Sequence, residues 1–552
     1  MSLGIEVQRS AALDPRAEQV MVPMRDGVQL ATDVYLPDGI DRAPAILVRE
    51  PYDKAGRYTY LPHVAPYFTG RGYVFVTQDV RGKFRSEGET VAFVHEVDDG
   101  YDTIDWVVAQ PWCDGTVGMW GDSYYGYTQW AAVASEHPAL KAIVPRVTSA
   151  DLGWYPVPRD AVIPLYAGEY LATCWLDHWL YSWQIDYGHR PLAEVFDAGF
   201  EAIGGRAEGF DRFVEESLGE RPIGDSGVHP FDVLRIPVLH AGGWFDNLMP
   251  DQMHDFLTLI ARPEVASLQY LEMDSSDHES YNLELAPIAP EDDHDVNDDA
   301  MERMIPRYLG GALDFFDVFL QGKSHHIPRV RWHQGNDTWR TAPSWPPPGA
   351  RELRLHLTAA DRATIDADGG GLRDAPDATK TTARWVHDPA NLVPSTVVNP
   401  FGFLLESPDE GTVEARPDVL TFTTEVLDRP LDLAGPIAVR VGLGSSAPSA
   451  HLFAKLVDVR PDGSTLMLVR GQTLVRDPDA SRPVQVDLAH IGYRVLPGHR
   501  LRLHLASSDF PLYLPHPGTD ENPWRAVTGR PSHQTLHVGG ASDAFVCLTL
   551  VD

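Results

Sequence analysis

The stretch Val117-Gly-Met-Trp-Gly121-Asp122-Ser123-Tyr124-Tyr125-Gly126 decides how this sequence is interpreted. Its first residues are strand-like, and the following segment, Tyr127–Ala134, is a plausible helix. A strand that passes through Gly-x-Ser into a helix is the setting of a nucleophile elbow, a sharp turn that lifts a serine hydroxyl above a sheet edge. The second glycine, however, comes three residues after Ser123 instead of two. Taken alone, the pattern is therefore also compatible with an ordinary buried or capping serine.

The sequence on both sides of this stretch alternates between short apolar strands and a helical segment. Val97–Gln110 has apolar residues near helical spacing, between strand-like segments rich in Val, Ile and aromatic residues. These segments are Val28–Tyr35, Ala45–Arg49, Tyr73–Gln78, Val117–Trp120 and Ala142–Val147. The alternation predicts a mostly parallel sheet covered by helices, an α/β fold.

The alternation stops between about Ser149 and Leu234, where aromatic residues recur at helical spacing. Trp154, Tyr166 and Trp175 are three of them. They are compatible with helix packing, or with a helical insertion that covers a pocket and lines it with aromatic rings. Strand character returns at Ile236–Ala241 and Leu268–Met273. We therefore expect residues 1–148 and 235–342 to form one α/β domain, with residues 149–234 inserted as a helical cap.

A proline-rich break, Pro343-Ser-Trp-Pro-Pro-Pro-Gly349, marks the next boundary. Beyond it the sequence consists of short strands and turns, and Arg460-Pro-Asp-Gly463 is typical of a hairpin turn between two strands. We expect residues 343–552 to form an all-β domain, a β-sandwich of the jelly-roll type.

Composition excludes several classes of function. The 552 residues include 45 Lys and Arg and 79 Asp and Glu, so the formal net charge is −34. Such a chain would repel nucleic-acid phosphates and anionic lipid, and we expect neither nucleic acid nor membrane as a partner. Cys113, Cys174 and Cys547 lie far apart and form no CxxC pair, so no zinc motif is readable, and three cysteines are too few for a disulfide framework. With no signal-like or membrane-spanning stretch, we expect a cytoplasmic protein.

A serine becomes nucleophilic when an imidazole accepts its proton and a carboxylate orients that imidazole. Two later strands end in suitable residues: Ile236–Ala241 is followed by Asp246, and Leu268–Met273 by His278. The order Ser123, Asp246, His278 is the one used by hydrolases built on a parallel sheet. His254 falls in a probable helix and His294 in an acidic loop, so His278 is the preferred base.

With these residues placed, the chain resembles the serine hydrolase superfamily of cocaine esterase, X-prolyl dipeptidyl-peptidase and α-amino-acid ester hydrolase, the CocE/NonD group. The resemblance extends from the N-terminus to the C-terminal β domain, and this group spaces its elbow glycines as they occur here. The matching motifs are Val22–Val28, Glu50-Pro-Tyr-Asp-Lys54, Gln78-Asp-Val-Arg-Gly82, Ser86-Glu-Gly88, Trp112-Cys-Asp-Gly115, Gly121–Gly126, Gly243-Trp-Phe-Asp246 and Pro497-Gly-His-Arg500.

The resemblance implies an α/β-hydrolase domain with a helical cap inserted before the acid residue, and a C-terminal jelly roll packed against both. It implies Ser123 as nucleophile, Asp246 as orienting acid and His278 as base. The Tyr52 hydroxyl and the Tyr124 backbone N–H would form the oxyanion hole, where each donor typically lowers the barrier by about 2.7–4 kcal/mol. No cofactor or metal is expected.

The substrate side of the site is less defined by the sequence. Trp154, Tyr166, Trp175, Trp244 and Phe245 are candidates for contact with a small acyl substrate. For Trp244, as for Asp79 and Arg81, a role in shaping the sheet and its loops is the stronger interpretation. The sequence leaves a homo-oligomer open.

The loop that carries His278 departs from the family pattern. The family usually has Gly-Pro-Trp-x-His-Gly, whereas this chain has Asp274-Ser-Ser-Asp-His-Glu279. Carboxylates that approach the imidazole would raise its pKa and move the activity to more alkaline pH.

An acidic stretch, Glu291–Asp299, follows this loop. It is compatible with a solvated loop, with a carboxylate cluster that attracts a cationic substrate, and, less well, with a metal site. The substrate hypothesis predicts that replacing Asp292, Asp293 and Asp295 with Asn raises KM for an amino-acyl ester and spares a neutral ester.

The leading functional hypothesis is a serine hydrolase that cleaves an ester or amide bond of a small, partly aromatic or amino-acyl substrate through an acyl-enzyme. X-prolyl aminopeptidase activity is the second choice, and acyl transfer to a non-water acceptor is a related alternative. A binding protein that has lost turnover is the alternative from another class.

Overall fold

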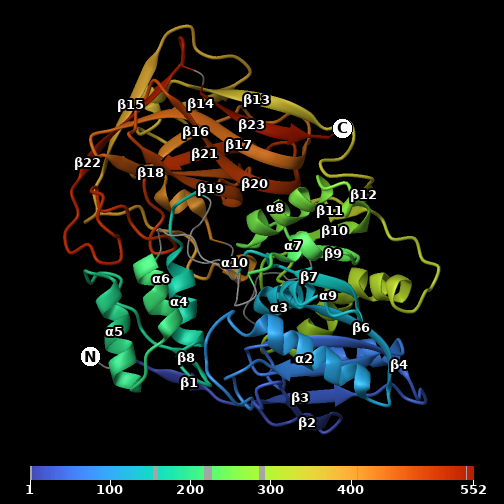
Figure 1. Ribbon diagram of the computed structural model, residues 1–552. Helices are drawn as coiled ribbons and strands as arrows, with labels where there is room; N and C mark the ends of the chain where they lie inside the picture. Colours follow the sequence, from blue (N-terminus) through green and yellow to red (C-terminus); the bar gives the residue numbers. More distant parts are fainter. Residues whose placement is uncertain are drawn as a thin grey trace.

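The computed structural model describes residues 3–152, 160–216, 227–284, 293–406, 408–542 and 544–551. An α/β domain and an all-β domain lie one above the other, and a group of helices lies beside the α/β domain, beneath the all-β domain (Figure 1). Within the described residues, three short 3₁₀ helices occur in the connections: Ala266–Leu268, Ala360–Arg362 and Glu410–Val413. None of the described helices is both long and apolar enough to cross a membrane.

A mixed sheet forms the centre of the α/β domain. Its described strands are ordered β12-β11-β10-β9-β7-β6-β4-β5-β3-β2, parallel from β5 to β11 and antiparallel at both ends. The strands are β2 (Glu18–Pro23), β3 (Gln29–Tyr35), β4 (Ala43–Glu50), β5 (Val74–Asp79), β6 (Cys113–Asp122), β7 (Leu140–Arg146), β9 (Val238–Gly243), β10 (Gln269–Asp274), β11 (Val330–His333) and β12 (Trp339–Ala342). All eight residues of β4 are buried, as expected of a central parallel strand covered on both faces. The predicted α/β class is confirmed.

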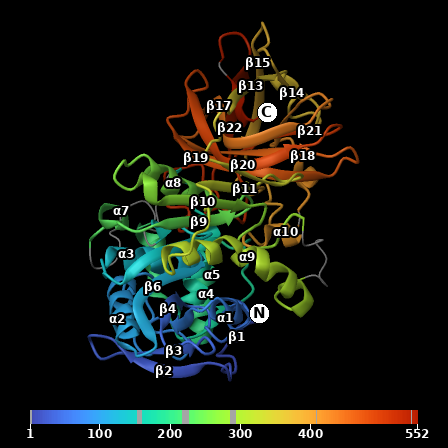
Figure 2. The same ribbon diagram turned by 90° about the vertical axis from the view of Figure 1, so that its right-hand side faces the viewer.

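Helices cover both faces of this sheet and create two apolar layers. On one face lie α1 (Leu61–Gly70) and α9 (Asp298–Phe319). On the other lie α2 (Glu96–Ala109), α3 (Ser123–Ala134), α7 (Pro230–Val233) and α8 (Met249–Ile260). Figure 2 shows the sheet between the two layers. The first turn of α2 contains Glu96, Asp98 and Asp99, whose charges favour a helix start there.

The cap consists of α4 (Leu165–Cys174), α5 (Ala193–Ile203), α6 (Glu208–Glu216) and the short strand β8 (Leu180–Ser182). β8 pairs with β1 (Glu6–Gln8), so the beginning of the chain is attached to the cap in space. Sequence patterns did not predict this contact, because a three-residue strand carries too little periodicity.

The C-terminal domain is built on one large, mainly antiparallel sheet. Its described strands are ordered β15-β22-β17-β23-β13-β14-β16-β21-β18-β19, with β20 paired to β17, and the short helix α10 (Phe403–Glu406) connects two of them. The strands are β13 (Arg351–Thr358), β14 (Gly370–Arg373), β15 (Thr381–His387), β16 (Leu420–Thr423), β17 (Leu431–Ser445), β18 (Ser449–Val459), β19 (Thr465–Arg476), β20 (Pro483–Val495), β21 (Arg500–Ala506), β22 (Ser532–Val538) and β23 (Phe545–Leu550). The Arg460–Gly463 turn joins β18 to β19 as predicted, with Gly463 at φ 88°. The all-β prediction is confirmed, and the finer jelly-roll topology stays a prediction.

A shared apolar core joins the two domains. Trp244, at the end of β9, stacks on Trp345 with ring centroids 5.0 Å apart and donates its Nε1–H to the His333 carbonyl at 2.9 Å. Met253 and Phe256 of α8 belong to the same core, which continues into the strands of the all-β domain. This contact fixes the loop after β9 against the all-β domain.

Candidate active site

Ser123 lies at the turn between β6 and α3 with a φ of 51°, a left-handed conformation that is strained for a serine. The turn needs both glycines. A Cβ on Gly121, which has φ 148°, would lie 2.1 Å from Tyr125 Cδ2, and one on Gly126 would lie 2.5 Å from Thr148 Cγ2. The glycine spacing therefore has a physical reason, because the ring two residues after the serine packs where a side chain at position 121 would be.

Asp246 and His278 meet above the sheet edge. Asp246 follows β9, His278 follows β10, and these strands are parallel neighbours, so both loops leave the same edge. His278 Nδ1 and Asp246 Oδ1 are 2.7 Å apart, and both residues are buried. The same Oδ1 accepts the Leu248 backbone N–H at 3.1 Å. His278 and Ser123 line one pocket.

The pKa of His278 is raised above its usual 6.5. Burial lowers it, but the Asp246 carboxylate at hydrogen-bond distance and the charges of Asp122 and Glu279 raise it by more. Of the two carboxylates next to His278 in sequence, Glu279 is among the main causes of this shift. Asp277 instead accepts the backbone N–H groups of Tyr281 and Leu404, at 2.9 and 2.8 Å.

Tyr52 lies beside Ser123, in the loop after β4. Burial raises the pKa of its phenol well above 10, against smaller lowering effects from the hydroxyls of Tyr170 and Ser123, so it stays a proton donor. The loop is fixed by Lys54, a buried ammonium 3.3 Å from Asp33 and 3.4 Å from Asp79. These contacts account for two motifs of the sequence, residues 50–54 and 78–82.

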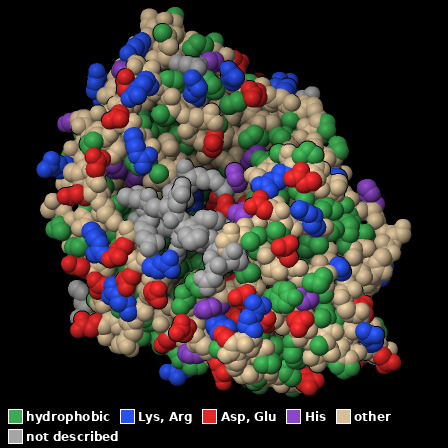
Figure 3. All heavy atoms as spheres, viewed as in Figure 1, with side chains coloured by type: hydrophobic (Ala, Val, Ile, Leu, Met, Phe, Trp, Pro, Cys, Tyr) green, Lys and Arg blue, Asp and Glu red, His purple; other side chains and the backbone are tan. Residues whose placement is uncertain are grey.

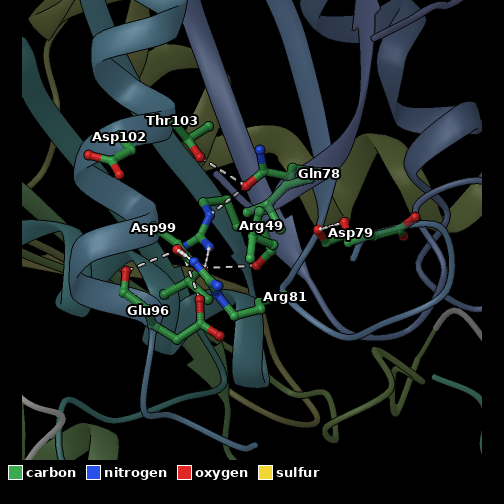
Figure 4. A network of polar contacts seen from close by, with 12 residues as sticks. Arg49, Gln78, Asp79, Arg81, Glu96, Asp99, Asp102 and Thr103 are labelled. Atoms are coloured by element: carbon green, nitrogen blue, oxygen red, sulfur yellow. Dashed lines mark hydrogen bonds and ion pairs between the residues drawn. The ribbon is translucent and has the colours of Figure 1, made fainter. Parts of the chain in front are cut away.

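The backbone N–H of Tyr124 lies in the first turn of α3, where N–H groups have no acceptor within the helix. The Tyr124 side chain contacts a buried polar network that includes Arg49, Arg81, Glu96 and Asp99, which Figure 4 shows. The Tyr124 hydroxyl donates to Glu96 Oε1 at 2.8 Å, and Glu96 pairs with Arg49 at 2.9 Å. Arg81 in turn pairs with Asp99 at 2.6 Å. The network supports the elbow from inside the fold, as the sequence interpretation of Arg81 expected.

The pocket in front of Ser123 has a volume of about 540 Å³, within the usual range of roughly 300–1,000 Å³ for small-molecule sites. Its charged lining is acidic: Asp122, Glu169 and Glu279 line it, and no Lys or Arg does among the described residues. Aromatic rings dominate the rest, including the tyrosines Tyr52, Tyr58, Tyr60, Tyr124, Tyr125, Tyr166, Tyr170, Tyr181 and Tyr187. The pocket therefore suits a ligand that is partly aromatic and is neutral or positively charged.

Of the five predicted substrate contacts, the structure places Tyr166 in this pocket. Trp175 lies in the core behind it, with its ring 4.9 Å from that of Tyr124. Trp244 and Phe245 line a neighbouring cavity of about 1040 Å³, and both belong to the interdomain core. Their aromatic character reflects packing between domains, which local sequence does not distinguish from ligand contact. Trp154 lies outside the described residues.

The pocket also contains residues that the motifs did not indicate. Glu169 and Tyr170 lie on α4, and their only sequence signal was the aromatic pattern of the cap. Asn399, Pro400 and Phe401 come from the all-β domain, with the Phe401 ring centroid 5.0 Å from that of His278. No local signal could have indicated a loop about 120 residues after the histidine.

The acidic stretch after His278 is only partly described. Asp293 accepts the Tyr281 hydroxyl at 2.5 Å and Asp295 accepts the Tyr60 hydroxyl at 3.0 Å, and neither lines the pocket. His294 is buried against Tyr281, and burial lowers its pKa to about 4. Over the face seen in Figure 3, described acidic side chains are interspersed with Lys and Arg. The described carboxylates that line the pocket are therefore those of Asp122, Glu169 and Glu279, and not those of Asp293 or Asp295.

The described residues contain no group of three or more His, Cys, Asp or Glu side chains placed to hold a metal ion. The three cysteines are free.

Comparisons with known proteins agree with this fold. Residues 26–163 match the X-Pro dipeptidyl-peptidase (S15) family, and residues 325–546 match the X-Pro dipeptidyl-peptidase C-terminal non-catalytic domain. A cocaine esterase of Rhodococcus sp. (strain MB1 Bresler) is 31% identical over 546 residues, which cover 90% of this chain and 91% of the relative. A crystal structure of an α-amino acid ester hydrolase is 26% identical with a TM-score of 0.80, covering 99% of this chain and 98% of that one. An archaeal aminopeptidase, 24% identical with a TM-score of 0.80 and covering 98% and 97% of the two chains, shares the fold.

The fold and the comparisons together define the protein as an α/β-hydrolase of the serine hydrolase class. The chain belongs to the CocE/NonD family, which includes cocaine esterase and the S15 peptidases, and acts on ester or peptide bonds.

Proposed function

We propose that Ser123 attacks the acyl carbonyl of the substrate, that His278 accepts its proton, and that Asp246 holds the imidazole in the reactive tautomer. The 2.7 Å contact between Asp246 and His278 Nδ1, in the pocket that Ser123 lines, carries the proposal. With Nδ1–H bonded to the carboxylate, Nε2 is free to accept the serine proton and then return it to the leaving group. An acyl-enzyme on Ser123 follows, and water releases the acid.

The Tyr52 hydroxyl and the Tyr124 backbone N–H are the proposed oxyanion donors. The phenol is buried and stays protonated, and the N–H lies in the unpaired first turn of α3. Both residues line the pocket together with Ser123, and such donors act most strongly away from water.

For the substrate, we propose a small molecule with an aromatic acyl part and a positively charged group close to it. The nine tyrosine rings supply flat apolar surface and can face a cation, and Glu279 and Glu169 supply negative charge that no described Lys or Arg of the lining neutralises. An aminopeptidase substrate with a free terminal amine has the same features and is the second candidate. A relative whose name gives an α-amino acid ester as substrate accords with either.

The first test is the dependence of activity on pH. Because the pKa of His278 is raised above 6.5 and the base must be neutral, kcat/KM for an uncharged ester should increase with pH through a midpoint above 6.5. In Glu279→Gln, which removes one of the charges that raise this pKa, the midpoint should move to lower pH. Initial rates between pH 5 and 9 measure both, and a rate already at its plateau at pH 6 would contradict the assignment.

The second test concerns the charge of the substrate. Phenyl esters of trimethylammonioacetic acid and of the isosteric, uncharged 3,3-dimethylbutyric acid differ only in the cation. Burial and the charge of Asp295 raise the pKa of Glu279 to about 7. At pH 8, above this pKa, the carboxyl group is mostly ionised. Glu279→Gln should raise KM for the cationic ester about tenfold, or about 1.4 kcal/mol, and leave the uncharged ester within about twofold.

Asp299→Asn is the matched control for that test, because Asp299 is an exposed carboxylate in the first turn of α9 outside the pocket. Asp299→Asn should leave KM unchanged for both esters. If Glu279→Gln changes KM equally for both esters, the proposed recognition of a cation is rejected.

A further inference from the structure

The hydroxyl of Tyr52 has a partner that comes from the cap. Tyr170, on α4, has its hydroxyl oxygen 3.2 Å from that of Tyr52, which donates to it, and the two rings meet edge-on with centroids 6.5 Å apart. Both side chains line the pocket in front of Ser123. The cap therefore reaches the proposed oxyanion hole through one hydrogen bond.

This bond must change when an oxyanion forms. A phenol has a single O–H donor, and the Tyr52 proton cannot serve both Tyr170 and an oxyanion. Once the Tyr52 proton turns to the oxyanion, its oxygen becomes free to accept, and Tyr170 can donate in return. Burial raises the pKa of Tyr170 well above 10, as it does for Tyr52, so both phenols keep their protons for this chain.

The resulting chain runs from Tyr170 through Tyr52 to the oxyanion. Each hydrogen bond in such a chain polarises the next, and the last one is stronger because its acceptor is charged. The gain exists only while charge is on the oxyanion, so it lowers the barrier without tightening substrate binding.

The position of Tyr170 is itself fixed from the α/β domain. Lys83, fully buried, donates from Nζ to the carbonyls of Cys174, Asp177 and Trp179 at 2.6, 2.9 and 3.0 Å. Cys174 is the last residue of α4, so the ammonium binds the negative end of the helix that carries Tyr170.

We propose that Tyr170 is a positioning residue of the oxyanion hole, which aligns the Tyr52 hydroxyl and donates to it when the oxyanion forms. The inference rests on the proposed role of Tyr52 and assigns a catalytic contribution to a cap helix.

The experiment is a double-mutant cycle on turnover of an uncharged p-nitrophenyl acyl ester. Tyr170→Phe removes one oxygen and should lower kcat about tenfold, the effect of losing one hydrogen bond, with KM within about twofold. Tyr52→Phe should lower kcat by about 10²–10³-fold. In the double variant kcat should equal that of Tyr52→Phe, because Tyr170 acts only through Tyr52.

Tyr73→Phe is the matched control. It also removes a buried phenol hydroxyl, which donates to Asp317 at 3.0 Å, but it lies outside the pocket. Its kcat should match the unmodified enzyme, and thermal unfolding of each variant reports any loss of stability.

An unchanged kcat in Tyr170→Phe, or a double variant in which the two effects multiply, would overturn the inference while leaving Tyr52 as an oxyanion donor. If Tyr52→Phe retains full kcat, the role of Tyr52 fails and the inference fails with it. Loss of activity in Ser123→Ala tests the serine mechanism separately, so the three failures are distinguishable.

Discussion

Replacing Ser123 with Ala should abolish turnover, with a decrease in kcat of about 10⁶-fold, the size seen when a serine nucleophile is removed. The reason is that the acyl-enzyme cannot form without the Ser123 oxygen, whatever His278 and Asp246 do. The measurement is pre-steady-state release of p-nitrophenol from an acyl ester. The unmodified enzyme should show a burst proportional to enzyme concentration, and Ser123→Ala should show none.

The matched control is Ser182→Ala, because Ser182 is an exposed serine on β8 that lines the same pocket. It should retain the burst. A serine-directed fluorophosphonate should label the unmodified enzyme and Ser182→Ala but not Ser123→Ala. Full turnover by Ser123→Ala would reject the acyl-enzyme mechanism, and absence of turnover in the unmodified enzyme would favour a binding protein.

Asp246→Asn should have the second largest effect, a decrease in kcat of about 10⁴-fold. The asparagine fills nearly the same volume, so the fold should persist. If its oxygen takes the position of Oδ1, it can accept the Leu248 N–H and the His278 Nδ1–H, but it has no negative charge to stabilise the imidazolium. If its NH₂ takes that position, Nδ1 must lose its proton, the proton lies on Nε2, and the imidazole can no longer accept one from Ser123.

The control for this variant is Glu279→Gln, which also neutralises a carboxylate near His278. The hydrogen bond to His278 Nδ1 comes from Asp246 and not from Glu279. Glu279→Gln should shift the pH midpoint and keep most of kcat at alkaline pH. Asp246→Asn should stay slow at every pH. Recovery of full kcat by Asp246→Asn at high pH would show that this carboxylate only adjusts the pKa, and would contradict its orienting role.

Much of the α/β domain could be predicted because its strands are short, buried and separated by helices with an apolar face. The segments expected at 45–49, 73–78 and 117–120 all lie within or overlap observed strands, β4, β5 and β6. Periodicity is a local property, so it was readable without knowing which strands are neighbours. The observed strands extend further where the flanking residues are polar or glycine, because sheet pairing rather than hydrophobicity decides their ends.

Local patterns could not predict the roles of the aromatic residues. Tyr166, Trp175 and Trp244 have similar sequence signals, yet one lines the pocket, one packs behind it and one joins two domains. Burial is decided by which distant surface each ring meets, and in all three cases that surface lies far away in the chain. The same applies to Glu279, whose carboxylate faces the pocket while that of Asp277 turns to the backbone of Tyr281 and Leu404.

The sequence by itself determined the class of fold, the elbow at Ser123 and the order in which Asp246 and His278 follow, because each depends on residues within one strand-turn unit. Only the tertiary structure decided that the two loops meet at 2.7 Å, that Phe401 of the all-β domain lines the pocket beside His278 and that Tyr170 of the cap contacts Tyr52. These are contacts between segments about 30 to 120 residues apart, and they form when large apolar faces of different parts of the fold are buried together. The hydrophobic effect is non-directional and depends on the apolar area buried. A local sequence pattern therefore does not show which distant segments pack against each other.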